Sequence, residues 1–105
     1  MPNSFAKSVH RQTAPITDQI DLTAPGFIRV LHVAASRVRP STELEVWYEC
    51  APELREEIAF RIHVEGTGHR YRHRGTHVGT FSTDDGSLVW HVFAEYPIER
   101  GDDDA

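Results

Sequence analysis

Apolar and polar residues alternate along several short stretches of this 105-residue chain, and this two-residue period limits the fold more than any other feature. In Glu43–Cys50 the alternation puts Leu44 and Val46 on one face and three glutamates with Trp47 on the other. Ile58–Glu65 repeats the pattern. Because no apolar stripe with the 3.6-residue period of a helix is long enough to pack, the sequence predicts an all-β fold.

Seven short strands are predicted between clusters of Gly, Pro and Asp. Their ranges are Lys7–Gln12, Gln19–Leu22, Phe27–Ser36, Glu43–Cys50, Ile58–Glu65, His77–Phe81 and Ser87–Tyr96. Six or seven short strands at this spacing are typical of a compact antiparallel β-sandwich or a small open barrel. Residues 1–105 would then form a single β domain, with an ordered core at about 8–96 and an acidic C-terminal tail at 97–105.

The connections suggest how the strands pair. Glu43–Cys50 and Ile58–Glu65 are expected to form a hairpin, and the link at Pro52–Glu57 has room for one helical turn. The apolar density of Phe27–Ser36 predicts a strand that is buried over most of its length. Asp84, Asp85 and Gly86 signal a hairpin turn with a residue at positive φ. The last strand is largely apolar on both faces, which favours a central position.

The inward faces of these strands define the predicted core, and Cys50 belongs to one of them. The expected core residues are Val33, Val46, Phe60, Ile62, Leu88, Trp90 and Val92. Cys50 is the only cysteine, so an intrachain disulfide and a Cys-rich zinc site are excluded, and a buried, inert thiol is expected. The N-terminal residues show no apolar signal region, so we expect a cytoplasmic protein without membrane contact.

The charge is distributed unevenly along the chain. The net charge is −5, and Glu95–Ala105 contributes −4 of it, because five acidic residues there face only Arg100. An acidic tail of this kind is usually solvated and repels nucleic acid and anionic lipid. Gly66–Thr83 shows the opposite balance, with Arg70, Arg72 and Arg74 and no acidic residue.

The loop that carries these arginines is the main candidate for a binding site. Arg and Tyr are enriched in protein interfaces, and loops on rigid scaffolds often carry binding residues. An acidic protein surface, nucleic acid or solvent alone could face such a loop. Trp47 is a second candidate, because alternation turns it outward unless another segment covers it. The candidate partner-binding residues are His69, Arg70, Tyr71, Arg72, His73, Arg74, His77 and Trp47.

Two other kinds of site receive little support. His63, His69, His73 and His77 fall within 15 residues, but a loop among glycines is not a rigid metal scaffold, so solvated histidines and no bound metal are expected. His32 and His91 lie among apolar neighbours, which favours hydrogen-bonded core or interface positions. The sequence contains no GxSxG, P-loop or GxGxxG motif, and we expect no enzyme activity and no cofactor.

A resemblance to a known family rests on five segments in chain order. They are HRQTAPITDQIDL, VLHVAASR, EVWYEC, FRIHVEGTGH and HVGTFSTDDGSLVWHVF, and they span most of residues 8–93. The chain resembles small proteins encoded by actinobacterial phages and grouped as a domain of unknown function. The resemblance implies a compact, phage-encoded β domain with no assigned activity. Members usually have a Pro-containing polar link after the Gly66–Gly68 segment, whereas His69–His77 here has no Pro and three Arg.

We therefore expect a non-enzymatic binding module that acts on a host or phage protein. The alternatives are a minor virion structural or assembly protein and a nucleic-acid-binding accessory protein, and pairing with a second copy of the chain stays open. The expected location is the cytoplasm of the bacterial host, with the virion as the alternative.

Overall fold

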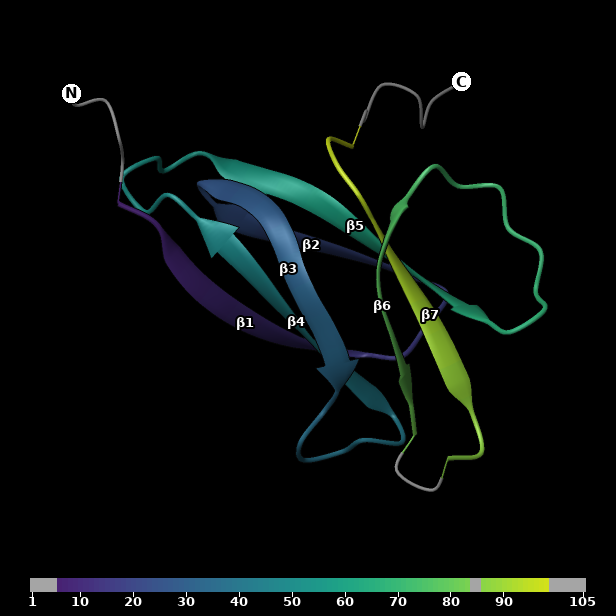
Figure 1. Cartoon of the computed structure of the whole chain (residues 1–105). Coiled ribbons are helices and arrows are strands. Elements are labelled where there is room, and N and C mark those ends of the chain that lie inside the picture. Colours follow the sequence, from purple (N-terminus) through teal and green to yellow (C-terminus); the bar gives the residue numbers. More distant parts are fainter. Residues whose placement is uncertain (1–5, 84–85, 99–105) are drawn as a thin grey trace.

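A computed structural model describes residues 6–83 and 86–98, and seven strands account for most of them (Figure 1). The strands are β1 (Ser8–Pro15), β2 (Gln19–Pro25), β3 (Phe27–Ala35), β4 (Glu43–Cys50), β5 (Glu57–Gly66), β6 (Thr76–Ser82) and β7 (Val89–Glu95). All seven predicted strands are present, although β1 and β2 extend several residues further than expected. The link at Pro52–Glu57 contains a turn and no helix, with the Leu54 N–H donating to the Ala51 carbonyl at 2.9 Å.

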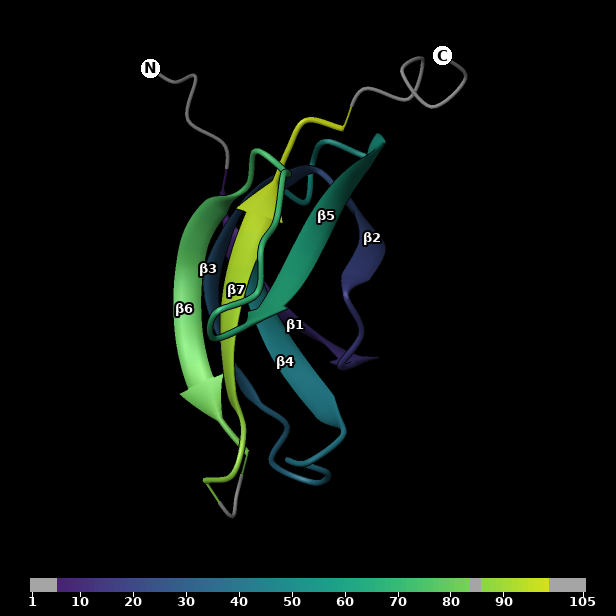
Figure 2. The same cartoon turned by 90° about the vertical axis from the view of Figure 1, so that its right-hand side faces the viewer.

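The strands form two antiparallel sheets that face each other. Sheet 1 has the order β1-β4-β3, and sheet 2 has the order β2-β5-β7-β6. Figure 2 views the two layers from the side. The buried hydrophobic side chains of the core come from the strands of both sheets. The prediction of a β-sandwich is confirmed, and so is the central position of the last strand, because β7 pairs with both β5 and β6.

The predicted hairpin between Glu43–Cys50 and Ile58–Glu65 is wrong. β4 pairs with β1 and β3, whereas β5 pairs with β2 and β7 in the other sheet. Both strands have a continuous apolar face, and they bury it by facing each other across the core. Tyr48 and Phe60 illustrate this, with ring centroids 5.4 Å apart.

β3 is less buried than its composition suggests. It is an edge strand of sheet 1 and carries two register irregularities against β4. As a result Phe27, Val30 and Val33 point into the core, while Leu31 and His32 are exposed. The expectation of a strand buried over most of its length is therefore wrong, because bulges and an edge position turn part of an apolar strand toward solvent.

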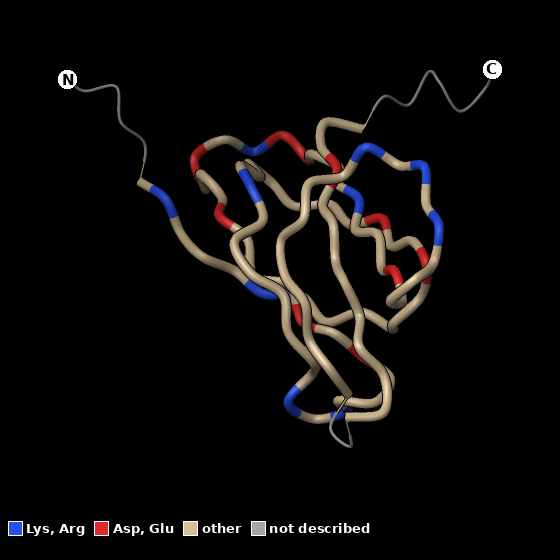
Figure 3. The backbone as a smooth tube through the Cα atoms, turned by 45° about the vertical axis from the view of Figure 1, so that its right-hand side comes forward, with Lys and Arg blue, Asp and Glu red and all other residues tan. Residues whose placement is uncertain are grey.

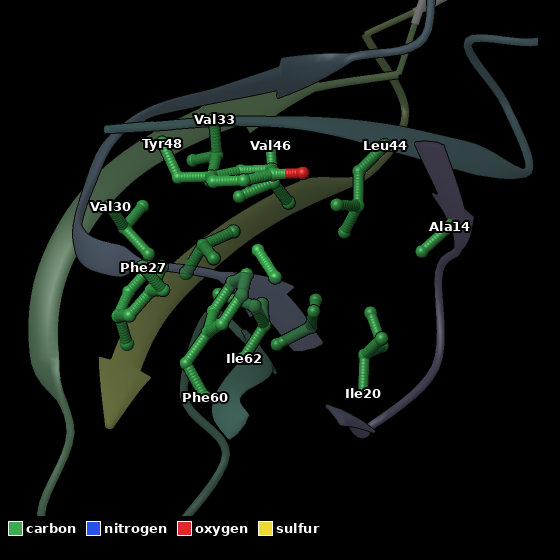
Figure 4. Close-up of a cluster of buried hydrophobic side chains, with 14 of the residues drawn as sticks. Ala14, Ile20, Phe27, Val30, Val33, Leu44, Val46, Tyr48, Phe60 and Ile62 are labelled. Carbon is green, nitrogen blue, oxygen red and sulfur yellow. The ribbon is translucent and has the colours of Figure 1, made fainter. Parts of the chain in front are cut away.

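The core consists of side chains from both sheets (Figure 4). Its largest fully buried members are Phe60, Leu44, Ile62, Val46 and Val92. Cys50 is also buried, and burial raises the pKa of its thiol, as expected for an inert cysteine.

One predicted core residue lies outside this core. Leu88 is 49% exposed, because it lies just before β7 in the turn of the β6–β7 hairpin, where its carbonyl accepts the Thr83 N–H at 3.0 Å. Trp90 is half-buried and packs against the core.

In the β6–β7 hairpin Gly86 has φ +75°, which confirms the predicted positive-φ turn. Asp84, Asp85 and residues 99–105 lie outside the described residues.

Candidate functional site

The arginine-bearing loop lies across the outer face of sheet 2, the face that points away from the core. It connects β5 to β6, and in Figure 2 it passes over β7. Its side chains alternate in environment: Arg70, Arg72 and Arg74 are exposed, whereas His73 points back to the sheet with only 9% of its side chain exposed. In Figure 3 the three arginines appear as separate blue segments along the loop. The loop thus shows one ring-bearing side to the sheet and one cationic side to solvent.

A stack of aromatic rings holds the loop on the sheet. The Tyr71 ring stacks on His73 with centroids 4.5 Å apart, and His73 stacks on His63 of β5 at 3.8 Å with ring planes 10° from parallel. Phe93 of β7 contacts the side of this stack, 5.0 Å from Tyr71 and 5.1 Å from His73. Aromatic contacts of this kind stabilise a structure beyond the burial of apolar area alone. The loop is therefore attached to the sheet by its own side chains.

His73 is fixed by one hydrogen bond at each ring nitrogen. The Gly75 backbone N–H donates to Nδ1 at 3.1 Å, so Nδ1 carries no proton. Nε2 then carries the proton and donates it to Glu65 Oε2, also at 3.1 Å. This arrangement assigns His73 as a neutral imidazole with a single tautomer. Burial, helped by the neighbouring His63, lowers the pKa of His73, and Glu65 opposes that shift only in part.

His63 lies beneath His73 and has its own carboxylate partner. His63 is only 6% exposed, and its Nε2 is 2.7 Å from Glu95 Oε1 on β7. The antiparallel register of β5 and β7 brings these two side chains together, since His63 is opposite Phe93 and Arg61 is opposite Glu95. The site therefore contains two stacked imidazoles, each joined to a glutamate from the sheet.

The three loop arginines have no carboxylate partner within the described residues. Elsewhere arginines pair with acids, as in Arg29 with Glu49 at 3.1 Å and Arg61 with Asp21 at 2.7 Å. The bond from Arg61 holds the pKa of Asp21 below its usual range. Arg72 and Arg74 border an open polar hollow of about 650 Å³, which is also lined by His63 and by residues 96–98. Unpaired guanidinium groups beside an open hollow are suited to bind carboxylates or phosphates.

The expectation that the four clustered histidines are solvated is wrong for His73 and for His63, which is only 6% exposed on β5, although His69 and His77 are exposed. His77 lies at the start of β6, with its ring 5.4 Å from Phe93. His32 is exposed, which contradicts a core position, while His91 is half-buried and contacts the hydroxyls of Thr67 at 2.8 Å and Thr80 at 3.1 Å.

Sequence reasoning missed the glutamates of the site. Glu65 lies near the end of β5 and Glu95 is the last residue of β7, and the sequence pattern alone gives neither of them a partner. The alternation of β5 and β7 places both carboxylates on the same outer face, but only the pairing of β5 with β7 makes them neighbours of the two histidines.

Trp47 lies on the other side of the molecule. It belongs to the outer face of sheet 1, where it is half-buried between its strand partners Arg11 and His32, and its ring is 5.5 Å from that of His32. The structure therefore brings the loop candidates together on one sheet and separates Trp47 from them. A single small partner surface would not contact both.

The described residues also limit the chemistry of the site. Within them, no three His, Cys, Asp or Glu side chains are arranged to hold a metal ion. No helix in the described part of the chain is long and apolar enough to cross a membrane.

The comparisons with known proteins identify a family but no activity. Searches of curated proteins and of solved structures find no match. A family model described as Domain of unknown function (DUF7352) matches residues 5–101, which includes every strand and the loop. Because that match covers nearly the whole chain, the protein belongs to this family of domains of unknown function.

Proposed function

We propose that this protein is a non-enzymatic binding module whose loop, residues 69–77, recognises an acidic segment of a protein partner. The observation that carries the proposal is the set of three exposed guanidinium groups, at Arg70, Arg72 and Arg74, without a carboxylate partner among the described residues. Carboxylates of a partner would provide the paired, charge-assisted hydrogen bonds that these groups lack.

The way the loop is held strengthens this proposal. A loop that is already ordered loses less conformational entropy on binding than a mobile one, so more of the interaction energy appears as affinity. The stack of Tyr71, His73 and His63 provides that order, and it leaves the three arginines of the loop exposed. The carboxylates nearest the stack, Glu65 and Glu95, are already engaged by the histidines.

A peptide titration tests the proposal directly. The probe is a fluorescein-labelled peptide of alternating Glu and Ser, compared with the same peptide carrying Gln in place of Glu. We expect binding of the Glu peptide, and at least a tenfold loss, about 1.4 kcal/mol, in the triple variant R70S/R72S/R74S. Raising the salt concentration should remove part of the affinity, because exposed charges are screened.

A matched control separates local recognition from net charge. The variant R29S/R39S/R55S removes the same charge from exposed arginines outside the loop. It should bind the Glu peptide nearly as tightly as the wild type. Equal binding of the Glu and Gln peptides, or equal losses in the two triple variants, would contradict the proposal.

Nucleic acid is the alternative ligand for an arginine-rich loop. A single-stranded oligonucleotide of mixed sequence, titrated under the same conditions, measures this alternative. If the oligonucleotide binds more tightly than the Glu peptide and R70S/R72S/R74S abolishes that binding, the loop recognises phosphates instead.

The biological setting is part of the proposal and rests on the sequence resemblance to phage-encoded proteins. We propose that the module acts in the cytoplasm of an infected bacterial host, on a host or phage protein. Affinity capture from infected-host lysate, with wild type and R70S/R72S/R74S side by side, would identify the target as a protein retained only by the wild type. Proteomics of purified virions tests the alternative of a minor virion or assembly component, which predicts that the chain copurifies with particles.

A further inference from the structure

The bond between His73 and Gly75 can exist only while His73 is neutral. Nδ1 of His73 accepts the Gly75 N–H at 3.1 Å, and an imidazolium has no lone pair on either nitrogen. Protonation would place one N–H against another. It would also add a charge to a ring that is only 9% exposed and stacked at 3.8 Å on His63.

The charged groups around the two rings do not remove this conflict. On β5, Arg61 and Glu65 flank His63, and β7 contributes Glu95. The edge strand β2 carries Asp21, which is held by Arg61. The remaining charged groups that line the hollows around the rings are Asp18, Arg70, Arg72 and Arg74, with His69 as a further titratable group. Glu65 and Glu95 would stabilise imidazolium ions, but neither can replace the acceptor that Gly75 loses.

We propose that the stacked pair His63–His73 is a pH-sensitive latch, which holds the loop on sheet 2 at neutral pH and releases it on mild acidification. This inference rests on the proposed function in one respect: release would disperse the arginine surface and so weaken the recognition of an acidic partner. The release itself concerns the free protein and can be measured without any ligand.

The direction of the effect follows from proton linkage. The pKa of His73 is lowered by burial and by His63 in the docked loop, whereas in the released loop it returns toward about 6.5. The docked state therefore binds fewer protons, and its advantage is complete above about pH 6.5 and declines as the pH falls below that value. For one proton the equilibrium between docked and released loop shifts by at most about tenfold per pH unit.

The amide of Gly75 reports this equilibrium directly. Hydrogen exchange followed by NMR gives its protection factor, the intrinsic exchange rate at each pH divided by the observed rate. We expect clear protection at pH 7.5 and a several-fold lower protection factor at pH 5.5, up to the limit of about tenfold that a single proton with a released-state pKa of about 6.5 allows, with core amides such as that of Val92 unchanged. An unchanged protection factor of Gly75 between these pH values would overturn the proposal.

Two variants test whether His73 is responsible. H73F keeps an aromatic ring for the stack but cannot titrate, so the order of the loop, measured from the backbone dynamics of residues 70–74, should become independent of pH. H69Q removes an exposed histidine of the same loop and should keep the wild-type response. An unchanged pH response in H73F, or its loss in H69Q, would contradict the latch.

The two proposals can fail separately. If the Gly75 protection factor does not change with pH but R70S/R72S/R74S still loses the Glu peptide at pH 7.5, the latch is wrong and the proposed function stands. If the loop is released at low pH but the Glu and Gln peptides bind equally, the latch stands and the proposed partner is wrong.

Discussion

Phe27 of β3 and Phe60 of β5 stack across the core with ring centroids 4.0 Å apart and ring planes 4° from parallel (Figure 4). The two residues belong to different sheets, so their contact joins the layers of the sandwich. Tyr48 and Tyr96 pack around this pair, at 5.4 Å from Phe60 and 5.0 Å from Phe27. The pair is therefore the centre of an aromatic cluster at one end of the core.

Replacing Phe60 with Ala should destabilise the fold by about 3 to 5 kcal/mol, because it leaves a cavity between the sheets and removes the partner of Phe27. Chemical denaturation followed by tryptophan fluorescence measures the free energy of unfolding. The matched control is Leu88→Ala, which removes an apolar side chain that is 49% exposed and should have little effect. Similar losses in both variants would show that Phe60 does not join the sheets.

Glu45 should contribute more to stability than Glu43, although both lie on β4 and pair with arginine. Glu45 is 3% exposed and accepts a hydrogen bond from the Arg37 backbone N–H at 3.1 Å, whereas the side chain of Glu43 is 26% exposed and that of its partner Arg39 is 69% exposed. Glu45→Ala should cost about 1 to 3 kcal/mol, because it leaves a shielded donor without its acceptor. Glu43→Ala should cost less than about 1 kcal/mol. Equal costs, measured by urea denaturation, would rule out a special role for the buried carboxylate.

Gly75→Ala should detach the loop and leave the core intact. A Cβ at this position would lie 2.9 Å from the Phe93 Cβ and 3.2 Å from His73 Nδ1, and neither of these atoms is the end of a flexible side chain. We expect the nuclear Overhauser effect between the rings of His63 and His73 to disappear, and affinity for the Glu peptide to fall several-fold. Thr76→Ala, an exposed neighbour, should leave both unchanged. A preserved ring contact in Gly75→Ala would show that the packing around Gly75 can relax.

Chelation should not affect the stability of the protein. Both ring nitrogens of His73 are occupied by Glu65 and Gly75, and His63 is held by Glu95, so the stacked pair has no free set of ligands for a metal. The melting temperature should be the same before and after dialysis against EDTA. Stoichiometric zinc in the purified protein, lost together with structure on chelation, would contradict this expectation.

The sequence alone determined the class of fold and the membership of most strands. Alternation in Glu43–Cys50 and Ile58–Glu65 is a local property, since successive side chains of any strand point to opposite faces. For that reason Val46, Phe60 and Ile62 could be assigned to the core without knowing which strands pair. Gly86 followed from turn chemistry, which is equally local.

Only the tertiary structure decided which strands are neighbours and what the loop contacts. Two strands with an apolar face can lie side by side in one sheet, with both faces covered by another layer, or in two sheets whose apolar faces cover each other. The alternation of β4 and β5 is the same in both cases. The proposed latch depends on which strand pairs with β5, because His63 and Glu95 are 32 residues apart and meet through the pairing of β5 with β7. The sequence therefore showed a loop with three arginines. The pairing of distant strands determined that His73 of this loop would be buried against the sheet.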